Sequence, residues 1–258
     1  MRTSCLVALL VVCSTAAGEE KVLWQIGRPD RDYAEFACAG DYLGYAQKFG
    51  NKPVVFEIGR SDAARDWPFI QAGPLDDWAP ARGQPRTIRF SLPGEPRGRY
   101  TLRIELVDVQ QPHPPRLGMT LNGHTGSFQL APGGGDGSLT DPKQGKPQKL
   151  EIPLPASLLK QGSNEIRLTC IEGCWILYDA ITLVGDPQAA AGPAEVASVS
   201  AQATPFFIRR DGQAQRAIDV SVVLTAPAQG LSVTVEALGQ KQVLPAEQMP
   251  LFGPLVAN

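Results

Sequence analysis

Histidine is scarce in this chain, and charge of one sign never accumulates. The 258 residues include only two histidines, His113 and His124, and carry a formal net charge of −2. The charged residues form no long run of one sign, so a nucleic-acid-binding surface is not supported. A serine hydrolase is disfavoured as well, because the chain lacks a GxSxG motif.

Two loop motifs are incomplete. Three consecutive glycines, at 133–135, lie in the polar stretch 130–147, but the strand, helix, lysine and hydroxyl of a phosphate-binding loop are missing from their places. We interpret this stretch as a surface loop. The ordered DxDxDG calcium loop is absent too, so no cofactor is predicted. A structural calcium ion held by loop oxygens of Asp62, Asp66 or Asp136 stays an alternative.

The apolar run near the start is short. Residues 5–12 read CLVALLVV, well below the roughly 20 residues that span a bilayer as a helix. The run follows Arg2 and precedes the small residues 14–17, which is the pattern of a signal peptide. We therefore predict a cleaved signal peptide at 1–18 and an exported protein, periplasmic or extracellular, with no membrane span after cleavage. An uncleaved anchor is the alternative.

Cysteine is also sparse, and two of the five cysteines leave with the signal peptide. Cys170 and Cys174 flank Ile-Glu-Gly, which reads as a tight turn, so we predict a disulfide between them. A metal site is the alternative, but neither histidine lies near the pair in sequence. Cys38 is then the odd thiol, expected to be buried.

Glycine and proline are plentiful, with 26 and 23 residues, and favour short strands joined by turns. Apolar and polar residues alternate in several stretches, as strands with one buried face require. Strands are expected at 22–26, 53–58, 86–92, 100–107, 117–122, 149–154, 164–169 and 174–184. We predict an all-β jelly-roll sandwich over residues 22–185, with 30–49 as loop and turn.

A second, smaller unit follows. Residues 186–195, DPQAAAGPAE, have the composition of a linker. Alternation resumes at 217–224 and 231–235, which predicts a partial immunoglobulin-like β domain over residues 196–258. About 100 residues is usual for a complete domain of that type.

Eight short segments, in this order, resemble the carbohydrate-binding-like third domain of rhamnogalacturonan lyases, polysaccharide lyase family 4. They are WQIGRPD at 24–30, EF at 35–36, FEIGRS at 56–61, DWPF at 66–69, LNG at 121–123, IPLP at 152–155, LLKQGSNEI at 158–166 and LYDAITL at 177–183. The resemblance covers about residues 22–184 and implies a galactose-binding-like fold. Similar domains also occur at the front of larger exported bacterial glycosidases.

The resemblance implies binding rather than cleavage. In that family the catalytic lysine and histidine belong to an earlier domain, for which there is no room between the predicted signal peptide and Trp24. We therefore expect no enzyme but a non-catalytic module for a polysaccharide or glycan. It could be the N-terminal part of a truncated glycosidase, with a catalytic glycosidase domain as partner. Two alternatives stay open: a lyase or glycoside hydrolase component with its own activity, and a structural module packed against a catalytic domain.

Residues 61–82 combine tryptophans with charged side chains, the mixture that covers sugar faces and pairs with hydroxyl groups. The alternative is that both tryptophans pack on the sandwich edge. Asn122 and His124 form a second candidate site, although an Asn-Gly turn needs no function. The predicted ligand-binding residues are Asp62, Arg65, Asp66, Trp67, Asp77, Trp78, Asn122 and His124.

Overall fold

The computed structural model describes residues 20–80, 82–186, 196–210, 213–224, 232–237, 240–245 and 254–257. The predicted signal peptide, 1–18, and residues 187–195 of the predicted linker lie outside this part of the chain. Asp186, the first residue assigned to the linker, instead ends a strand. Within the described residues, no helix has both the length and the apolar character to cross a membrane.

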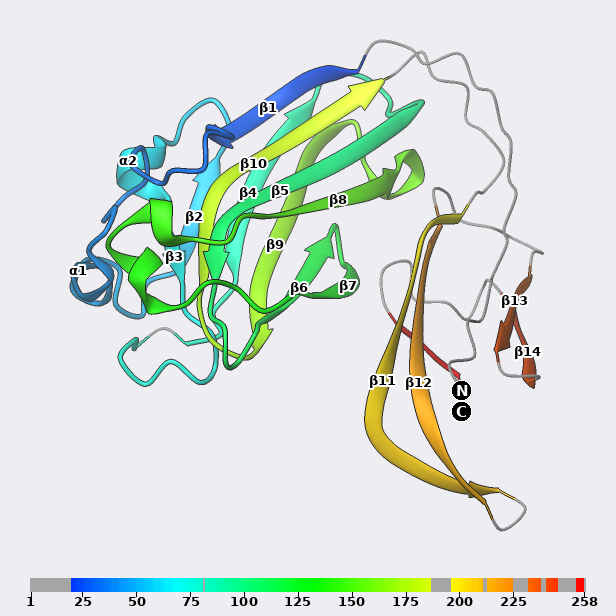
Figure 1. The fold of residues 1–258 in the computed structure, drawn as a ribbon. Helices are drawn as coiled ribbons and strands as arrows, with labels where there is room; N and C mark the ends of the chain where they lie inside the picture. The colour runs from blue at the N-terminus through cyan, green and yellow to red at the C-terminus, as the bar shows by residue number, and fades with distance from the viewer. Residues whose placement is uncertain are drawn as a thin grey trace.

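Two five-stranded sheets pack face to face between residues 21 and 186 (Figure 1). The first sheet has the order β1-β10-β5-β8, with β3 also paired to β10, and every pair is antiparallel. Its strands are β1 (Lys21–Gly27), β3 (Ile70–Gln71), β5 (Arg99–Val109), β8 (Gln148–Pro155) and β10 (Ile176–Asp186).

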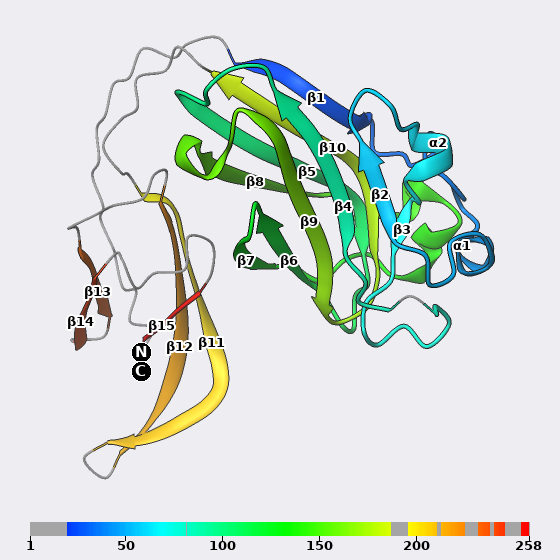
Figure 2. The same cartoon turned by 180° about the vertical axis from the view of Figure 1, so that it is seen from behind.

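The second sheet has the order β2-β4-β9-β6-β7 and is best seen from behind (Figure 2). Only its β2–β4 pair is parallel among the described strands. Its strands are β2 (Val54–Glu57), β4 (Arg86–Leu92), β6 (Arg116–Leu121), β7 (His124–Gln129) and β9 (Gly162–Glu172). The helices are short: α1 (Tyr42–Lys48), α2 (Ala63–Asp66), η1 (Asp136–Leu139), η2 (Pro142–Gln144) and η3 (Ala156–Leu158). The predicted all-β jelly-roll sandwich is confirmed.

Buried apolar residues alternate with exposed polar residues along the strands, and the apolar residues form the core. On β4, Ile88 and Phe90 are buried while Arg89 between them is exposed. Phe90 packs against Trp24 of β1, with ring centroids 5.3 Å apart, so Trp24 belongs to the core. Burying one such side chain stabilises the fold by about 1.5–3 kcal/mol.

Arg86 is an exception to this pattern, because its charged side chain lies on the buried face of β4. Its guanidinium donates from Nη1 to the carbonyl oxygen of Pro68 at 2.6 Å, and from Nη2 to that of Ile70. The ring centroids of Trp67 and Tyr178 lie 5.4 and 5.3 Å from the guanidinium carbon. These contacts hold the segment around Pro68 and Ile70 against the core. They also provide hydrogen-bond donors for two buried carbonyl groups.

Among the described residues after 195 there are five further strands: β11 (Val196–Arg210), β12 (Gln213–Leu224), β13 (Ser232–Ala237), β14 (Gln240–Pro245) and β15 (Pro254–Ala257). They form a three-stranded antiparallel sheet, β11-β12-β15, and a two-stranded sheet, β13-β14. β structure in this part agrees with the sequence expectation. Its partial immunoglobulin-like fold stays a prediction.

Candidate functional site

Helix α1 brings two tyrosines to one end of the sandwich. Its first turn is capped by Asp41, whose Oδ1 accepts the amide N–H of Gly44 at 2.8 Å. Gly44 permits this cap, because a Cβ there would lie 2.0 Å from a carboxylate oxygen of Asp41. Tyr45 is buried and Tyr42, three residues earlier, is half-buried. The sequence prediction of loop and turn over 30–49 is therefore wrong for α1.

The segment between β3 and β4 is organised by a buried carboxylate. Asp76 is only 4% exposed, and its Oδ2 accepts the amide N–H of Gly73 at 2.7 Å. Its Oδ1 accepts the indole Nε1–H of Trp78 at 3.2 Å. Burial raises the pKa of Asp76, while the bonds from Gly73, Trp78 and the Cys174 thiol oppose that rise.

Trp78 meets α1 at this end. Its ring stands edge-on to that of Tyr42, with centroids 5.2 Å apart and planes at 86°, and its centroid lies 6.1 Å from that of Tyr45. Trp78 and Tyr42 are both half-buried, so each keeps part of its ring surface open to solvent. Leu43 and Leu75, on the same two segments, are 54% and 55% exposed. We refer to Tyr42 and Trp78 as the aromatic pair.

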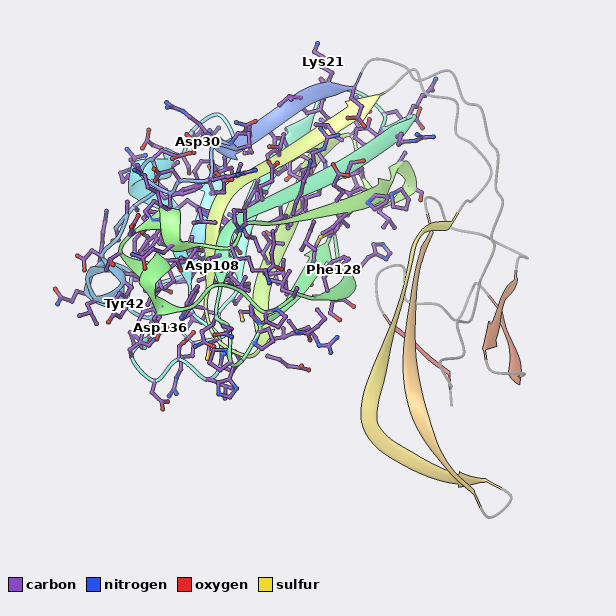
Figure 3. All side chains as sticks on the ribbon, viewed as in Figure 1. Lys21, Asp30, Tyr42, Asp108, Phe128 and Asp136 are labelled. Carbon is purple, nitrogen blue, oxygen red and sulfur yellow. The ribbon has the colours of Figure 1, made fainter. Side chains whose placement is uncertain are left out.

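Two exposed acidic residues, Asp77 and Asp136, belong to the same end of the sandwich as the aromatic pair. Asp77 follows the buried Asp76 directly; its side chain is 92% exposed and forms an ion pair with Arg82. Asp136 of η1 also acts on this region, because its charge raises the pKa of Asp76. Figure 3 shows Tyr42 and Asp136 at the same end of the sandwich.

The structure separates the two tryptophans predicted to bind a ligand. Trp78 lies at the surface, whereas Trp67 is fully buried, with ring centroids 6.0 Å from Phe56 and 5.6 Å from Tyr178. Trp67 therefore offers no ring face to a sugar. The alternative placed it on the sandwich edge, and its complete burial shows that it packs in the core instead. Asp77, another of the predicted ligand-binding residues, directly precedes Trp78.

The other predicted residues lie elsewhere. Asp62 caps α2 by accepting the amide N–H of Ala64, and Asp66 accepts that of Asp62 while pairing with Arg65. Asn122 uses its amide within the fold: Nδ2 donates to the carbonyl of Leu158 and to Asn164, and Oδ1 accepts the amide N–H of Glu165.

His124 is exposed at the start of β7. Tyr42 is the residue of the candidate site that was not expected from the sequence; two tyrosines spaced i, i+3 after a capping aspartate were the available signal.

The predicted disulfide is not formed in the structure, where Cys170 and Cys174 are both free thiols. The Cys170 thiol is buried and donates to the carbonyl oxygen of Cys174 at 3.1 Å, and the Cys174 thiol bonds to Asp76. Burial, with nearby carboxylates, raises the pKa of Cys170 to about 12 and that of Cys174 to about 11, so little thiolate forms at neutral pH. Cys38, expected to be buried, is half-buried.

No group of three or more His, Cys, Asp or Glu side chains gathers for a metal within the described part of the chain. Asp62 and Asp66, two of the calcium candidates, already bind backbone amides of α2. Asp179, a residue of the LYDAITL segment, accepts the amide N–H groups of Asp30 and Arg31 at 3.1 Å each. It thus fastens the segment after β1 to β10.

The two-sheet sandwich matches a known family of carbohydrate-binding-module-like domains. The sequence profile described as CBM-like, polysaccharide lyase family 4, domain III, matches residues 22–183. The chain belongs to this family. It is also 30% identical over 186 residues to a rhamnogalacturonate lyase of Dickeya dadantii (strain 3937), covering 64% of this chain and 28% of that enzyme. The chain thus spans about a quarter of the length of this relative.

Solved structures with related folds include two family 35 carbohydrate-binding modules. One, from an environmental isolate, is 19% identical with a TM-score of 0.30, covering 43% of this chain and 73% of that one. The other, from Cellvibrio japonicus Abf62, is 20% identical with a TM-score of 0.28, covering 42% and 71%. At these scores neither likeness identifies a ligand or a site.

Proposed function

We propose that residues 22–185 form an exported, non-catalytic module that holds a glycan at the aromatic pair. Family membership supports a glycan as the ligand. The observation that carries the site is the half-exposed contact of Trp78 with Tyr42, since aromatic rings of this kind cover the C–H faces of sugars. The proposal includes a signal peptide at 1–18, a linker at 186–195 and a partial immunoglobulin-like domain at 196–258.

The chemistry around the pair supports binding rather than catalysis. Asp76 uses both carboxylate oxygens on Gly73 and Trp78, so its role in the structure is to hold the segment. Asp77 is ion-paired and open to solvent. Glycosidases need two carboxylates that flank a scissile bond at roughly 5–10 Å. A catalytic glycosidase domain as partner remains part of the proposal.

Trp78→Ala tests the site. Losing an aromatic platform weakens glycan binding by about 1–3 kcal/mol, which is about tenfold or more in affinity. The measurement is affinity electrophoresis of the full chain through gels that contain plant polysaccharides. Phe128→Ala is the matched control: this aromatic is also half-buried against the core, but lies on β7, on the other side of the sandwich in Figure 3. Equal loss in both variants would contradict the proposed site.

The absence of catalysis has its own assay. The purified chain should release neither reducing ends nor unsaturated uronic products from pectic or mannan substrates. Turnover abolished by substitution of one carboxylate would instead favour the enzyme alternative.

A further inference from the structure

Arg86 is a buried cation that the proposed glycan site does not yet explain. Its guanidinium donates to the carbonyl oxygens of Pro68 and Ile70 rather than to a carboxylate. Removing a charge from water is costly, and an apolar residue of similar size often serves a core equally well. The presence of arginine at this position therefore indicates a contact that an apolar side chain could not make.

Three aromatic rings lie around this guanidinium. The ring centroids of Tyr45, Trp67 and Tyr178 are 5.9, 5.4 and 5.3 Å from its carbon atom, within the range at which a ring face attracts a cation. Trp67 and Tyr178 are fully buried in the core of the sandwich. Tyr45 comes instead from α1, the helix that carries Tyr42. Of the three rings, Tyr45 is thus the one that connects the buried charge to the aromatic pair.

Tyr45 also contacts the aromatic pair directly. Its centroid lies 6.1 Å from that of Trp78, with the ring planes at 66°. Tyr42 lies three residues earlier on the same helix, where side chains are neighbours on one face. A displacement of Tyr45 would therefore change how the rings of Tyr42 and Trp78 meet.

Helix α1 depends on such contacts for its position. It has seven residues, whereas isolated helices shorter than about 12–15 residues are only marginally stable in water. Asp41 caps its first turn, and Tyr45 is its buried residue. The attachment of α1 to the sandwich therefore goes through the ring that faces Arg86.

Resting on the proposed function, we infer that Arg86 is a positioning residue of the glycan site. Through Tyr45, its guanidinium holds α1 so that Tyr42 meets Trp78 edge-on before a ligand arrives. Arg86 touches no ligand itself, because its side chain is buried. Rings that are already in place lose less conformational entropy when a ligand binds.

Tyr45→Leu and Tyr178→Leu form a matched pair, because each removes one tyrosine ring from the same guanidinium. Both should lower the urea midpoint. Retention of the folded full chain is then measured by affinity electrophoresis in gels that contain rhamnogalacturonan, arabinan or galactomannan. Tyr45→Leu should weaken retention about three- to tenfold, whereas Tyr178→Leu should leave it unchanged. Tyr45→Phe, which keeps the ring, should restore most of the retention.

Two variants test Arg86 itself. Arg86→Met removes the charge, and Arg86→Lys keeps the charge but loses the planar group, so Arg86→Lys should weaken retention less. Adding Tyr45→Leu to Arg86→Lys should cause no loss beyond that of Tyr45→Leu alone, because Arg86 acts through Tyr45. Amide hydrogen exchange of residues 42–50 without ligand gives a second measurement. Exchange should be faster in Arg86→Lys than in the parent chain, and unchanged in Tyr178→Leu.

The outcomes separate the positioning role from the proposed function. Full retention with unchanged exchange in Arg86→Lys overturns the positioning role, as do additive losses in the double variant or equal losses in Tyr45→Leu and Tyr178→Leu. The proposed function is untouched by these results. Absence of retention in the parent chain, or retention unaffected by Trp78→Ala, contradicts the proposed function, and the exchange rates of α1 then decide the contact between Arg86 and Tyr45.

Discussion

The indole Nε1 of Trp78 donates a hydrogen bond to Oδ1 of Asp76, 3.2 Å away, although Asp76 is buried and Trp78 only half-buried. Asp76 is 4% exposed, whereas Trp78 keeps part of its ring at the surface. The buried carboxylate thus fixes the direction of a surface ring. Such a bond lowers the conformational entropy that the ring would lose on meeting a ligand.

Asp76→Ala should lower both stability and glycan retention. It leaves the amide of Gly73 and the indole N–H of Trp78 without their acceptor, at a cost of about 1–3 kcal/mol for a buried donor. Asp76→Asn keeps an acceptor oxygen and should restore part of the retention. Urea unfolding measures the stability, tryptophan emission the surroundings of Trp78, and affinity electrophoresis the glycan retention. Full retention in Asp76→Ala with unchanged emission would show that Asp76 does not orient Trp78.

Trp67 should behave in the opposite way to Trp78. Trp67→Ala leaves a cavity between Phe56 and Tyr178 and should cost about 3–5 kcal/mol of unfolding free energy. Trp67→Phe should cost much less, because the indole Nε1 has no hydrogen-bond partner within the described structure to lose. Urea unfolding gives both values. Normal stability with lost glycan retention in Trp67→Ala would identify Trp67 as a ligand contact after all.

The regular strands could be predicted from the sequence, but the burial or exposure of single loop side chains could not. On β4, the alternation of Ile88 and Phe90 with Arg89 shows the buried face, and the strand bounds match. Trp67 and Trp78 both stand among charged residues, so composition cannot separate them. Their difference depends on distant partners: Tyr178 packs on Trp67, and Tyr42 packs on Trp78.

Other failures have local causes. Strand β7 was not expected, because His124–Gln129 is mainly polar and lies at the edge of its sheet. Arg86 begins the predicted strand 86–92 on the same face as Ile88, and no pattern in the sequence shows that the carbonyls of Pro68 and Ile70 accept from its guanidinium. A periodic sequence pattern cannot reveal these two carbonyl partners, because their positions depend on how the irregular segment before β4 crosses the sheet.

Asn122→Ala should reduce stability without changing glycan retention. The variant loses three hydrogen bonds, to Leu158, Asn164 and Glu165, and places alanine at a φ of 50°, where asparagine is better tolerated. A loss of about 2 kcal/mol is expected in urea unfolding. His124→Ala, at an exposed neighbouring position, is the control and should change neither quantity. Reduced retention with normal stability in Asn122→Ala would instead support the second predicted site.

Asp179 should make the protein less stable as the pH rises from about 4 to about 6. Burial raises the pKa of Asp179 to about 6, with the charges of Asp30 and Glu105 acting in the same direction. An unfolded aspartate has a pKa near 3.9, so between these values the folded state binds more protons than the unfolded state. Linkage then requires stability to fall as the pH rises through this window and to level off above it.

Asp179→Asn isolates this contribution, because its amide oxygen can still accept the N–H groups of Asp30 and Arg31 but cannot ionise. Urea midpoints of the variant and the parent chain, measured from pH 4 to pH 7.5, give the comparison. The stability of the variant relative to the parent should increase with pH across the window, since only the parent must bury a charge there. Other titrating groups act in both proteins and cancel in the difference. A difference that stays constant, or that runs the other way, would show that the Asp179 carboxylate is not destabilised in the folded state.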